Sequence, residues 1–353
     1  MQPSLLLGKD THRDLAALLK KEGDLTISGA SNETAKAMLT SHLLGFNPQS
    51  SFLVTQNDEG AESLRHWLQF FDCHAELFHP VEDAEGHIQP EHMQRFLIAM
   101  KPEPGHPKIF VMSRATWDGE FPSMEELEET TVTLKVGSKI DFTAFFETLI
   151  ARGYSHGDDL YLAPGEYRRI GDVLDIFPIQ SPCPYRITFD FETVEKISAV
   201  DSDDLSKVTD AGTSIAISPA MYTRRSPIHG QFPEGMLLIL DDQDELGPSL
   251  RSGGQSLKIP ILDFTSFPEH ARHHAHLRYL SVLKFYTLTD FLNDVRDKLT
   301  QNWTLLVVTK RMDELEEIFK EEHVAHTTKP ERREGAVTLI HADEHEAPFT
   351  TAF

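Results

Sequence analysis

Apolar and polar residues alternate along the first 130 residues in a βα pattern. Short apolar runs, typical of buried strands, are separated by segments with the i, i+3, i+4 spacing of amphipathic helices. The pattern predicts strands over residues 25–28, 51–55, 74–78 and 108–112, and helices over residues 10–22, 33–44, 59–70 and 91–100. Strands that alternate with helices of this length favour a parallel sheet covered on both faces.

Between residues 130 and 215 the pattern changes to that of β-hairpins. Two runs with alternating apolar residues, 164–178 and 185–191, are separated by a segment in which Pro182 and Pro184 cannot continue a strand. We interpret the two runs as the strands of a hairpin. Alternation in the second run sorts its side chains onto two faces: Tyr185, Ile187, Phe189 and Phe191 on one, and Arg186, Thr188, Asp190 and Glu192 on an outward polar surface.

The α/β pattern returns after residue 216. It predicts a strand over residues 236–240, a turn or loop over residues 251–256, and a final βαβ unit with helices at 288–299 and 311–322 and strands at 304–308 and 337–340. We therefore predict an α/β domain over residues 1–130, an inserted α+β hairpin domain over 131–215, a return to the first domain over 216–285, and a small α/β unit over 286–353. Because the last unit stops in strand-like residues at Phe353, we expect the chain to be a piece of a longer protein.

Composition limits the classes of function. No apolar run approaches the roughly 18 to 20 residues that span a bilayer, and the N-terminus lacks the basic start of a signal peptide, so we expect a cytoplasmic protein. Cys73 and Cys183 are far apart and have no metal-type spacing. The formal net charge of −23 would repel nucleic-acid phosphates, so we do not expect strong DNA binding by this chain alone. Without an obvious self-complementary apolar stripe, we expect a monomer.

The loop after the first predicted strand is where an α/β nucleotide-binding protein would hold phosphate. A working loop reads G-x-x-x-x-G-K-[ST], because its second glycine lets backbone N–H groups reach the phosphates that its lysine contacts. After Gly29, however, Thr34 and Ala35 stand at the second-glycine and lysine positions, and Lys36 comes one residue late, a rotation of about 100° on a helix. Glu33 adds a negative charge where phosphates would lie. We expect no cofactor here.

One pattern favours an enzyme instead. The apolar strand that ends at Asp241 and Asp242 is similar to the strand whose acidic end coordinates magnesium in P-loop ATPases. The simpler interpretation is that one of these residues caps the element after a core strand. With the altered loop, the strand indicates a degenerate P-loop, RecA-like parallel-sheet domain. An active ATPase or helicase half that uses Asp241 and Asp242 is the alternative.

A histidine cluster and one aspartate are further candidates for chemistry. His270, His273, His274 and His276 could ligate a metal, since His270 and His274 would share a helix face, but neither a cysteine nor a carboxylate triad accompanies them. We interpret them as solvated side chains of a connecting segment, with no metal. Asp175 interrupts an apolar strand-like run, and we expect it to accept hydrogen bonds from a neighbouring turn.

The hairpin segment also carries a family resemblance. The residues Pro164-Gly165-Glu166-Tyr167, then Asp175-Ile176-Phe177-Pro178 and Pro184-Tyr185-Arg186, resemble blocks in the amino-terminal module of bacterial transcription-repair coupling factors (Mfd). This module is shared with the excinuclease subunit UvrB. Supporting blocks lie at residues 132–141 and 149–154, so the resemblance is concentrated between residues 130 and 200 and is weaker toward both ends.

The resemblance implies that the hairpin domain docks the excinuclease subunit UvrA. Arg186 matches the family's binding arginine, and a guanidinium is suited to carboxylate recognition across an interface. At two positions the chain departs from the family: Ile170 replaces an arginine, although Arg168 and Arg169 are near, and Asp190 replaces an aromatic residue. Arg169 and Ile170 should point to opposite faces, so neither simply replaces the other. Asp190 could weaken docking or pair with Arg186.

The resemblance is closer to coupling factors than to UvrB, because residues 79–87 are acidic and contain no tyrosine where UvrB has a tyrosine-rich DNA-binding hairpin. It implies a full-length ATP-driven DNA translocase that displaces stalled RNA polymerase and recruits UvrA. ATP, Mg²⁺, DNA and RNA polymerase would then bind to domains that these residues lack. We therefore predict a non-catalytic adaptor, with a stand-alone interaction module for another partner as a further alternative.

Overall fold

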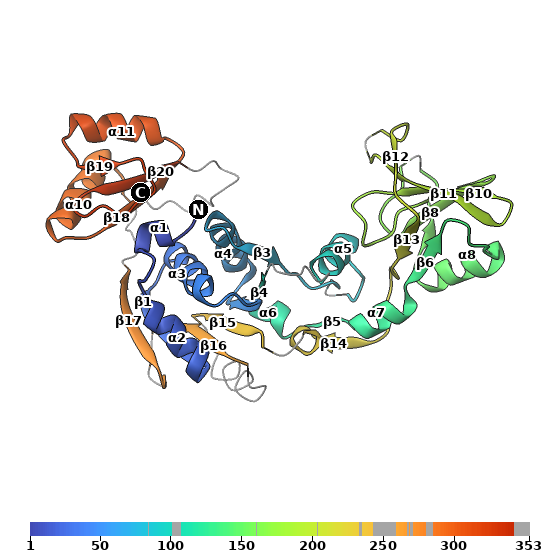
Figure 1. The fold of residues 1–353 in the computed structure, drawn as a ribbon, viewed down its shortest axis with the longest axis horizontal. Coiled ribbons are helices and arrows are strands. Elements are labelled where there is room, and N and C mark those ends of the chain that lie inside the picture. The colour runs from blue at the N-terminus through green and yellow to red at the C-terminus, as the bar shows by residue number, and fades with distance from the viewer. Residues whose placement is uncertain are drawn as a thin grey trace. The chain divides into compact units, whose positions relative to one another are not determined.

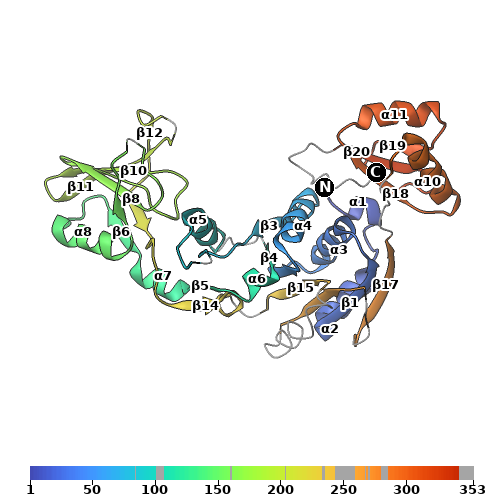
Figure 2. The ribbon, with the colours of Figure 1, turned by 180° about the vertical axis from the view of Figure 1, so that it is seen from behind.

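The computed structural model describes residues 1–83, 85–100, 107–159, 161–202, 204–232, 235–242, 259–266, 268, 271–279 and 285–341. The chain divides into two compact units. The first comprises residues 1–77, 104–114 and 233–353, and the second comprises residues 78–103 and 115–232. Figures 1 and 2 show the elements of both units from two sides.

A seven-stranded parallel sheet forms the centre of the first unit (Figure 1). Its strands follow the order β17-β1-β16-β15-β2-β4-β3, and all their pairings are parallel. They are β1 (Asp24–Ala30), β2 (Ser51–Thr55), β3 (His74–Leu77), β4 (Lys108–Ser113), β15 (Leu237–Asp241), β16 (Ile261–Phe264) and β17 (His274–Tyr279). The α/β fold class predicted from the sequence is confirmed.

Helices cover one face of this sheet. Leu19, Leu39 and Leu68 from three helices share one hydrophobic core with Ile27 and Ile239 of the strands. The helices of this layer are α1 (Ser4–Leu7), α2 (Arg13–Glu22), α3 (Glu33–Phe46) and α4 (Asp58–Phe70). Their positions agree with the predicted helices 10–22, 33–44 and 59–70, because the apolar spacing that predicts them is the spacing that this core buries.

Local signals explain where these helices begin and end. The side chain of Asn32 accepts a hydrogen bond from Ala35 N (2.7 Å), and that of Asn57 accepts one from Gly60 N (2.8 Å). Each asparagine thereby satisfies an N–H group that has no partner inside the first helical turn. Helix α2 ends at Gly23, whose left-handed φ of 69° suits a residue without a Cβ atom.

The C-terminal part of the first unit is a small α/β layer. Three parallel strands in the order β18-β20-β19 pack against two helices around Phe291 and Phe319. The elements are α10 (Leu288–Thr300), β18 (Leu305–Thr309), α11 (Met312–Glu321), β19 (His326–Thr327) and β20 (Val337–His341). The predicted βαβ pattern is confirmed for the helices and for strands β18 and β20.

The second unit contains a six-stranded sheet in the order β12-β11-β10-β9-β8-β7, which we call the hairpin sheet. Helix α8 packs on its inner face, where Leu149 joins Leu174, Ile187 and Ile197 in one core (Figure 2). The strands are β7 (Ser155–His156), β8 (Glu166–Ile170), β9 (Val173–Ile176), β10 (Tyr185–Asp190), β11 (Thr193–Val200) and β12 (Val208–Asp210), and α8 spans Phe142–Ala151.

Shorter elements complete this unit. Strand β6 (Val132–Lys135) pairs with β13 (Ser214–Ile217), and β5 (Glu120–Pro122) pairs with β14 (Arg225–Pro227). The remaining elements are α5 (Pro90–Ala99), α7 (Met124–Thr130) and the 3-10 turn η1 (Ile228–Gln231), and α6 (Arg114–Trp117) lies where the chain passes between the units.

Two details of the predicted hairpin are wrong. The run 164–178 is not one strand, because the chain turns at Gly171 (φ 61°) and Asp172 and divides it into β8 and β9. Strand β9 then pairs antiparallel with β10, as predicted for the second part of the run. Phe191 does not join Ile187 and Phe189 in the core, because it lies in the turn after β10 and is 86% exposed.

Candidate functional site

The meander of β8, β9 and β10 places three charged residues side by side on the face of the hairpin sheet opposite helix α8. Arg168 on β8 lies opposite Asp175 on β9, and Asp175 lies opposite Arg186 on β10. Side chains directly opposite in adjacent strands point to the same face of a sheet. We call these three residues the arginine ladder.

Asp175 holds the ladder together. Arg186 donates two hydrogen bonds to it, from Nε to Oδ1 (2.7 Å) and from Nη2 to Oδ2 (3.0 Å), and Nη2 of Arg168 lies 3.6 Å from Oδ2. Arg168 also donates a hydrogen bond to the carbonyl of Asp159 (2.7 Å). Such a two-pronged contact fixes the plane of the guanidinium as well as its position.

Burial differs between the members of the ladder. The side chain of Asp175 is 13% exposed, whereas that of Arg186 is 33% exposed. The hydrogen bonds that Arg186 donates to Asp175 raise the pKa of its guanidinium above the usual value, so the cation is retained at any physiological pH. Arg186 thus offers a fixed positive charge at the outward surface where the alternation pattern predicts it.

Two interpretations of this region are corrected. Asp175 accepts hydrogen bonds from a neighbouring strand and not from a turn, and Asp190 is not the partner of Arg186. Asp190 lies at the end of β10, opposite Thr193. The sequence analysis missed Asp175 as a positioning residue, although a carboxylate inside an apolar run is a signal that a cation lies nearby.

Arg169 and Ile170 point to opposite faces, as predicted. The Arg169 guanidinium lies over the ring of Phe142, 3.7 Å from its centroid, and is held at helix α8 by this cation–π contact. Ile170 is 67% exposed. Arg168, and not Arg169, is therefore the nearby arginine that shares a surface with Arg186.

The altered phosphate-loop position lies in the first unit, between β1 and α3. Lys36 forms an ion pair with Asp241 at the end of β15, and their side chains are 9% and 14% exposed. Burial raises the pKa of Asp241, and the positive charge of Lys36 opposes this shift. The two residues that P-loop chemistry would direct at phosphate and magnesium are thus directed at each other.

The surrounding loop has structural partners of its own. The N–H of Ala35 is used by the cap at Asn32, and Glu33 accepts a hydrogen bond from Ser63. Gly29 adopts a φ of 77°, and a Cβ atom on it would lie 1.9 Å from the carbonyl oxygen of Leu277 in β17. Gly29 therefore permits the close approach of β17, which is a packing role.

Comparison with known proteins identifies the second unit's central domain. Residues 132–222 match the family described as the UvrB interaction domain. They include the whole arginine ladder.

The wider chain has distant similarity to coupling factors and to UvrB. It is 28% identical to the transcription-repair-coupling factor of Bacillus subtilis over 193 residues, which are 53% of this chain and 16% of that protein. It is 27% identical to the coupling factor of Staphylococcus aureus over 225 residues (58% and 19%), and 23% identical to the UvrABC system protein B of Methanococcus maripaludis over 198 residues (55% and 29%). The chain thus matches less than a third of the length of each relative, and the predicted resemblance is confirmed at this level.

The histidine segment is a strand and not a connector. His274 and His276 lie on β17, where both rings contact the hydroxyl of Ser28, at 2.7 Å from Nε2 and 2.9 Å from Nδ1. His270 lies outside the described residues. Within the described part of the chain, no group of three or more histidine, cysteine, aspartate or glutamate residues is placed to hold a metal ion.

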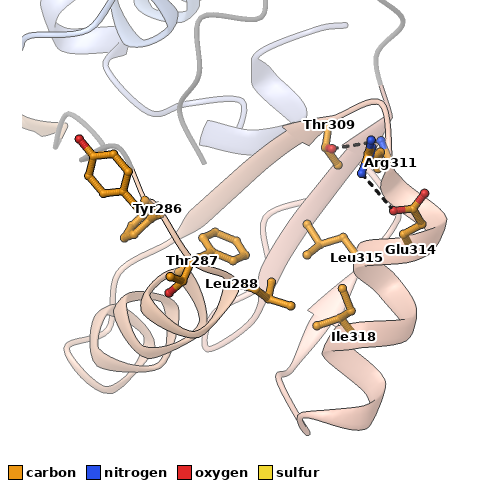
Figure 3. A pocket seen from close by; sticks show the side chains of 10 residues that line it. Tyr286, Thr287, Leu288, Thr309, Arg311, Glu314, Leu315 and Ile318 are labelled. Carbon is orange, nitrogen blue, oxygen red and sulfur yellow. Dashed lines mark hydrogen bonds and ion pairs between the residues drawn. The ribbon is translucent and has the colours of Figure 1, made fainter.

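A pocket of about 320 Å³ lies between the starts of α10 and α11 (Figure 3). Apolar side chains such as Leu288, Leu315 and Ile318 line it. Its charged lining residues, Arg311 and Glu314, form an ion pair with each other (3.6 Å). The pocket therefore has no arrangement of groups that is typical of catalysis. The described helices also include none with the length and apolarity needed to cross a membrane.

Proposed function

We propose that this chain is a non-catalytic adaptor module whose UvrB interaction domain docks UvrA through the face of the hairpin sheet that carries the arginine ladder. Arg186 is the central contact residue of the proposal. Its support is the arginine ladder: a carboxylate that is 13% exposed orients a more exposed guanidinium within the domain that matches the family.

The chemistry of Arg186 suits recognition of a carboxylate on a partner. A guanidinium carries five N–H donors in a planar fork, and Asp175 uses two of them. Because Asp175 has already fixed the plane of the fork, less side-chain entropy is lost when a partner binds. Arg168 and Lys196 add positive charge to the same face, on a chain whose formal net charge is −23.

We also propose that the first unit is a scaffold without ATPase activity. The Lys36–Asp241 ion pair, the Asn32 cap and the contact of Glu33 with Ser63 support this part of the proposal. ATP-driven translocation on DNA and contact with RNA polymerase would belong to segments of a longer protein, in line with the small share of the coupling factors that this chain matches.

Titration of UvrA with this chain tests the docking proposal. Wild type should bind, and Arg186→Ala should weaken binding by about thirtyfold or more, the size of effect typical of a central arginine contact. Lys207→Ala is the matched control, because Lys207 is a cation of the same domain whose side chain is 70% exposed and which lies outside strands β8, β9 and β10. Equal affinity of wild type and Arg186→Ala would remove Arg186 from the interface.

A different partner is the second candidate, and the exposed Ile170 and Asp190 favour it because they change the surface beside Arg186. Wild-type protein that does not bind UvrA in the same titration would support this alternative. The domain would then share its fold with coupling factors but not their binding partner.

A further inference from the structure

We infer that Phe191, at the tip of the β10–β11 hairpin, is the aromatic anchor of the docking surface and inserts into an apolar pocket of UvrA. The inference rests on the proposed function. It adds a specificity-determining residue that neither the arginine ladder nor the alternation pattern predicts.

The backbone of Phe191 is in an unfavourable conformation for its residue type. The pairing of Asp190 with Thr193 leaves Phe191 and Glu192 as a two-residue loop, and Phe191 has a φ of 53°. Two-residue hairpin loops with positive φ strongly favour glycine, asparagine or aspartate. A bulky residue in this region is an outlier, so the local sequence is not optimised for the turn.

Burial of the Phe191 side chain does not compensate for this unfavourable backbone conformation. Phe191 is 86% exposed, so its ring is not buried in the core that holds Phe189. In the isolated domain, both the exposure of the aromatic ring and the positive φ of Phe191 are unfavourable. Strained residues concentrate at functional sites, where binding to another molecule compensates for them.

The surroundings of Phe191 at one end of the hairpin sheet combine the exposed apolar side chains of Ile170 and Val136 with the exposed carboxylates of Asp172, Asp190 and Glu192. On one side, the N–H of Phe189 donates to the carbonyl of Asp172 in the β8–β9 turn (2.8 Å), next to the exposed Ile170. On the other side, Ile140 N donates to the carbonyl of Glu192 (2.9 Å), so the loop that follows the exposed Val136 borders the tip.

The tip lies close along the chain to two members of the arginine ladder. Ile170 lies two residues beyond Arg168 on β8, and Phe191 lies five residues beyond Arg186 along β10 and its turn. Protein interfaces combine aromatic anchors with arginine at their centre. The partner surface should therefore carry an apolar pocket for the phenyl ring next to carboxylates that meet Arg186 and Arg168.

The test compares UvrA binding and stability for the full chain. Phe191→Ala should weaken UvrA binding by about tenfold or more, while the midpoint of urea denaturation stays at the wild-type value. Phe191→Gly should weaken binding equally but raise the midpoint, because glycine adopts the positive φ without strain. Tyr286→Ala is the control, since Tyr286 is an exposed aromatic residue (87%) that belongs to the other compact unit.

The outcomes separate this inference from the proposed function. If Arg186→Ala loses affinity and Phe191→Ala binds as wild type does, Phe191 is not an anchor and the docking proposal stands. A fall in the denaturation midpoint of Phe191→Gly would show that the ring is structural and would overturn the inference. If wild type does not bind UvrA, both proposals fail.

Discussion

At the scale of single residues, two ion pairs of this chain differ in how deeply they are buried. Lys36 and Asp241 occupy the positions nearest to those of a phosphate-binding lysine and a magnesium-binding aspartate, yet they neutralise each other in a setting that is almost fully buried. Asp175 and Arg186 form a second pair, in which the arginine stays more exposed than the aspartate. In the first pair both charges are turned away from solvent, whereas in the second pair the Arg186 guanidinium remains accessible to a partner.

Lys36→Met should destabilise the first unit by about 3 kcal/mol, because it removes the cation that is paired with a buried carboxylate. The double variant Lys36→Met with Asp241→Leu should recover most of this loss, since well-packed apolar residues replace buried ion pairs at little cost. Urea denaturation measures both values. A Lys36→Met variant as stable as wild type at neutral pH would contradict the importance of the pair.

The same variant predicts a pH dependence. Burial raises the pKa of Asp241 above its unfolded value, so its contribution to the free energy of unfolding is present at low pH and is lost as the pH rises through the folded pKa. Lys36 opposes the shift, and its removal raises that pKa further. The difference in stability between wild type and Lys36→Met should therefore be largest at neutral pH and shrink toward about pH 4.

At the scale of elements, two glycine positions determine how neighbouring strands are placed. Strand β17 approaches β1 so closely that the carbonyl of Leu277 occupies the space beside Gly29. The turn at Gly171 divides one predicted strand and thereby brings Arg168 opposite Asp175. Each arrangement depends on one glycine, Gly29 or Gly171. In the sequence pattern, such a glycine only indicates that a strand is interrupted.

Gly29→Ala should destabilise the first unit by at least about 1 kcal/mol more than Gly23→Ala does, because a methyl group there collides with backbone atoms. Gly23 is a matched control: it borders the same strand with a φ of 69°, but its nearest neighbour would lie 4.0 Å from an added Cβ atom. Urea denaturation of the two variants gives the comparison. Equal midpoints would mean that β17 can move away from β1.

At the scale of the whole molecule, the chain combines a unit built on a parallel sheet with a second unit in which residues 132–222 match the UvrB interaction domain family. The residues of the loop between β1 and α3 are engaged with the protein itself. The arginine ladder, through which we propose docking, lies in the other compact unit. This arrangement agrees with the adaptor that we propose.

Calorimetric titration with Mg-ATP tests the non-catalytic part of this proposal. We expect no saturable binding at micromolar nucleotide, because no glycine-rich cradle presents its N–H groups and Lys36 is paired. Micromolar affinity for Mg-ATP that is lost in Lys36→Met would contradict the scaffold proposal. Affinity that Lys36→Met retains would place the nucleotide elsewhere on the chain.

Much of the fold follows from local patterns. The βα alternation predicts helices α2, α3 and α4 and strands β1, β2, β3, β4 and β15 of the first unit, but not β16 or β17. Period-two alternation correctly places Ile187 and Phe189 inside and Arg186 outside. These features depend on neighbouring residues along one element, and burial of the apolar face of that element stabilises them directly. The departure of Thr34, Ala35 and Lys36 from the phosphate-loop pattern is likewise visible in the sequence.

The partners of the charged residues depend on contacts between distant segments. Lys36 meets Asp241 across 205 positions, and Arg186 meets Asp175 because the turn at Gly171 sets the register of three strands. A shift of one residue in that register would turn every side chain of a strand to the other face. The sequence by itself therefore determined the elements and their buried faces, whereas the tertiary structure decided which charges are paired and left Phe191 exposed at the tip.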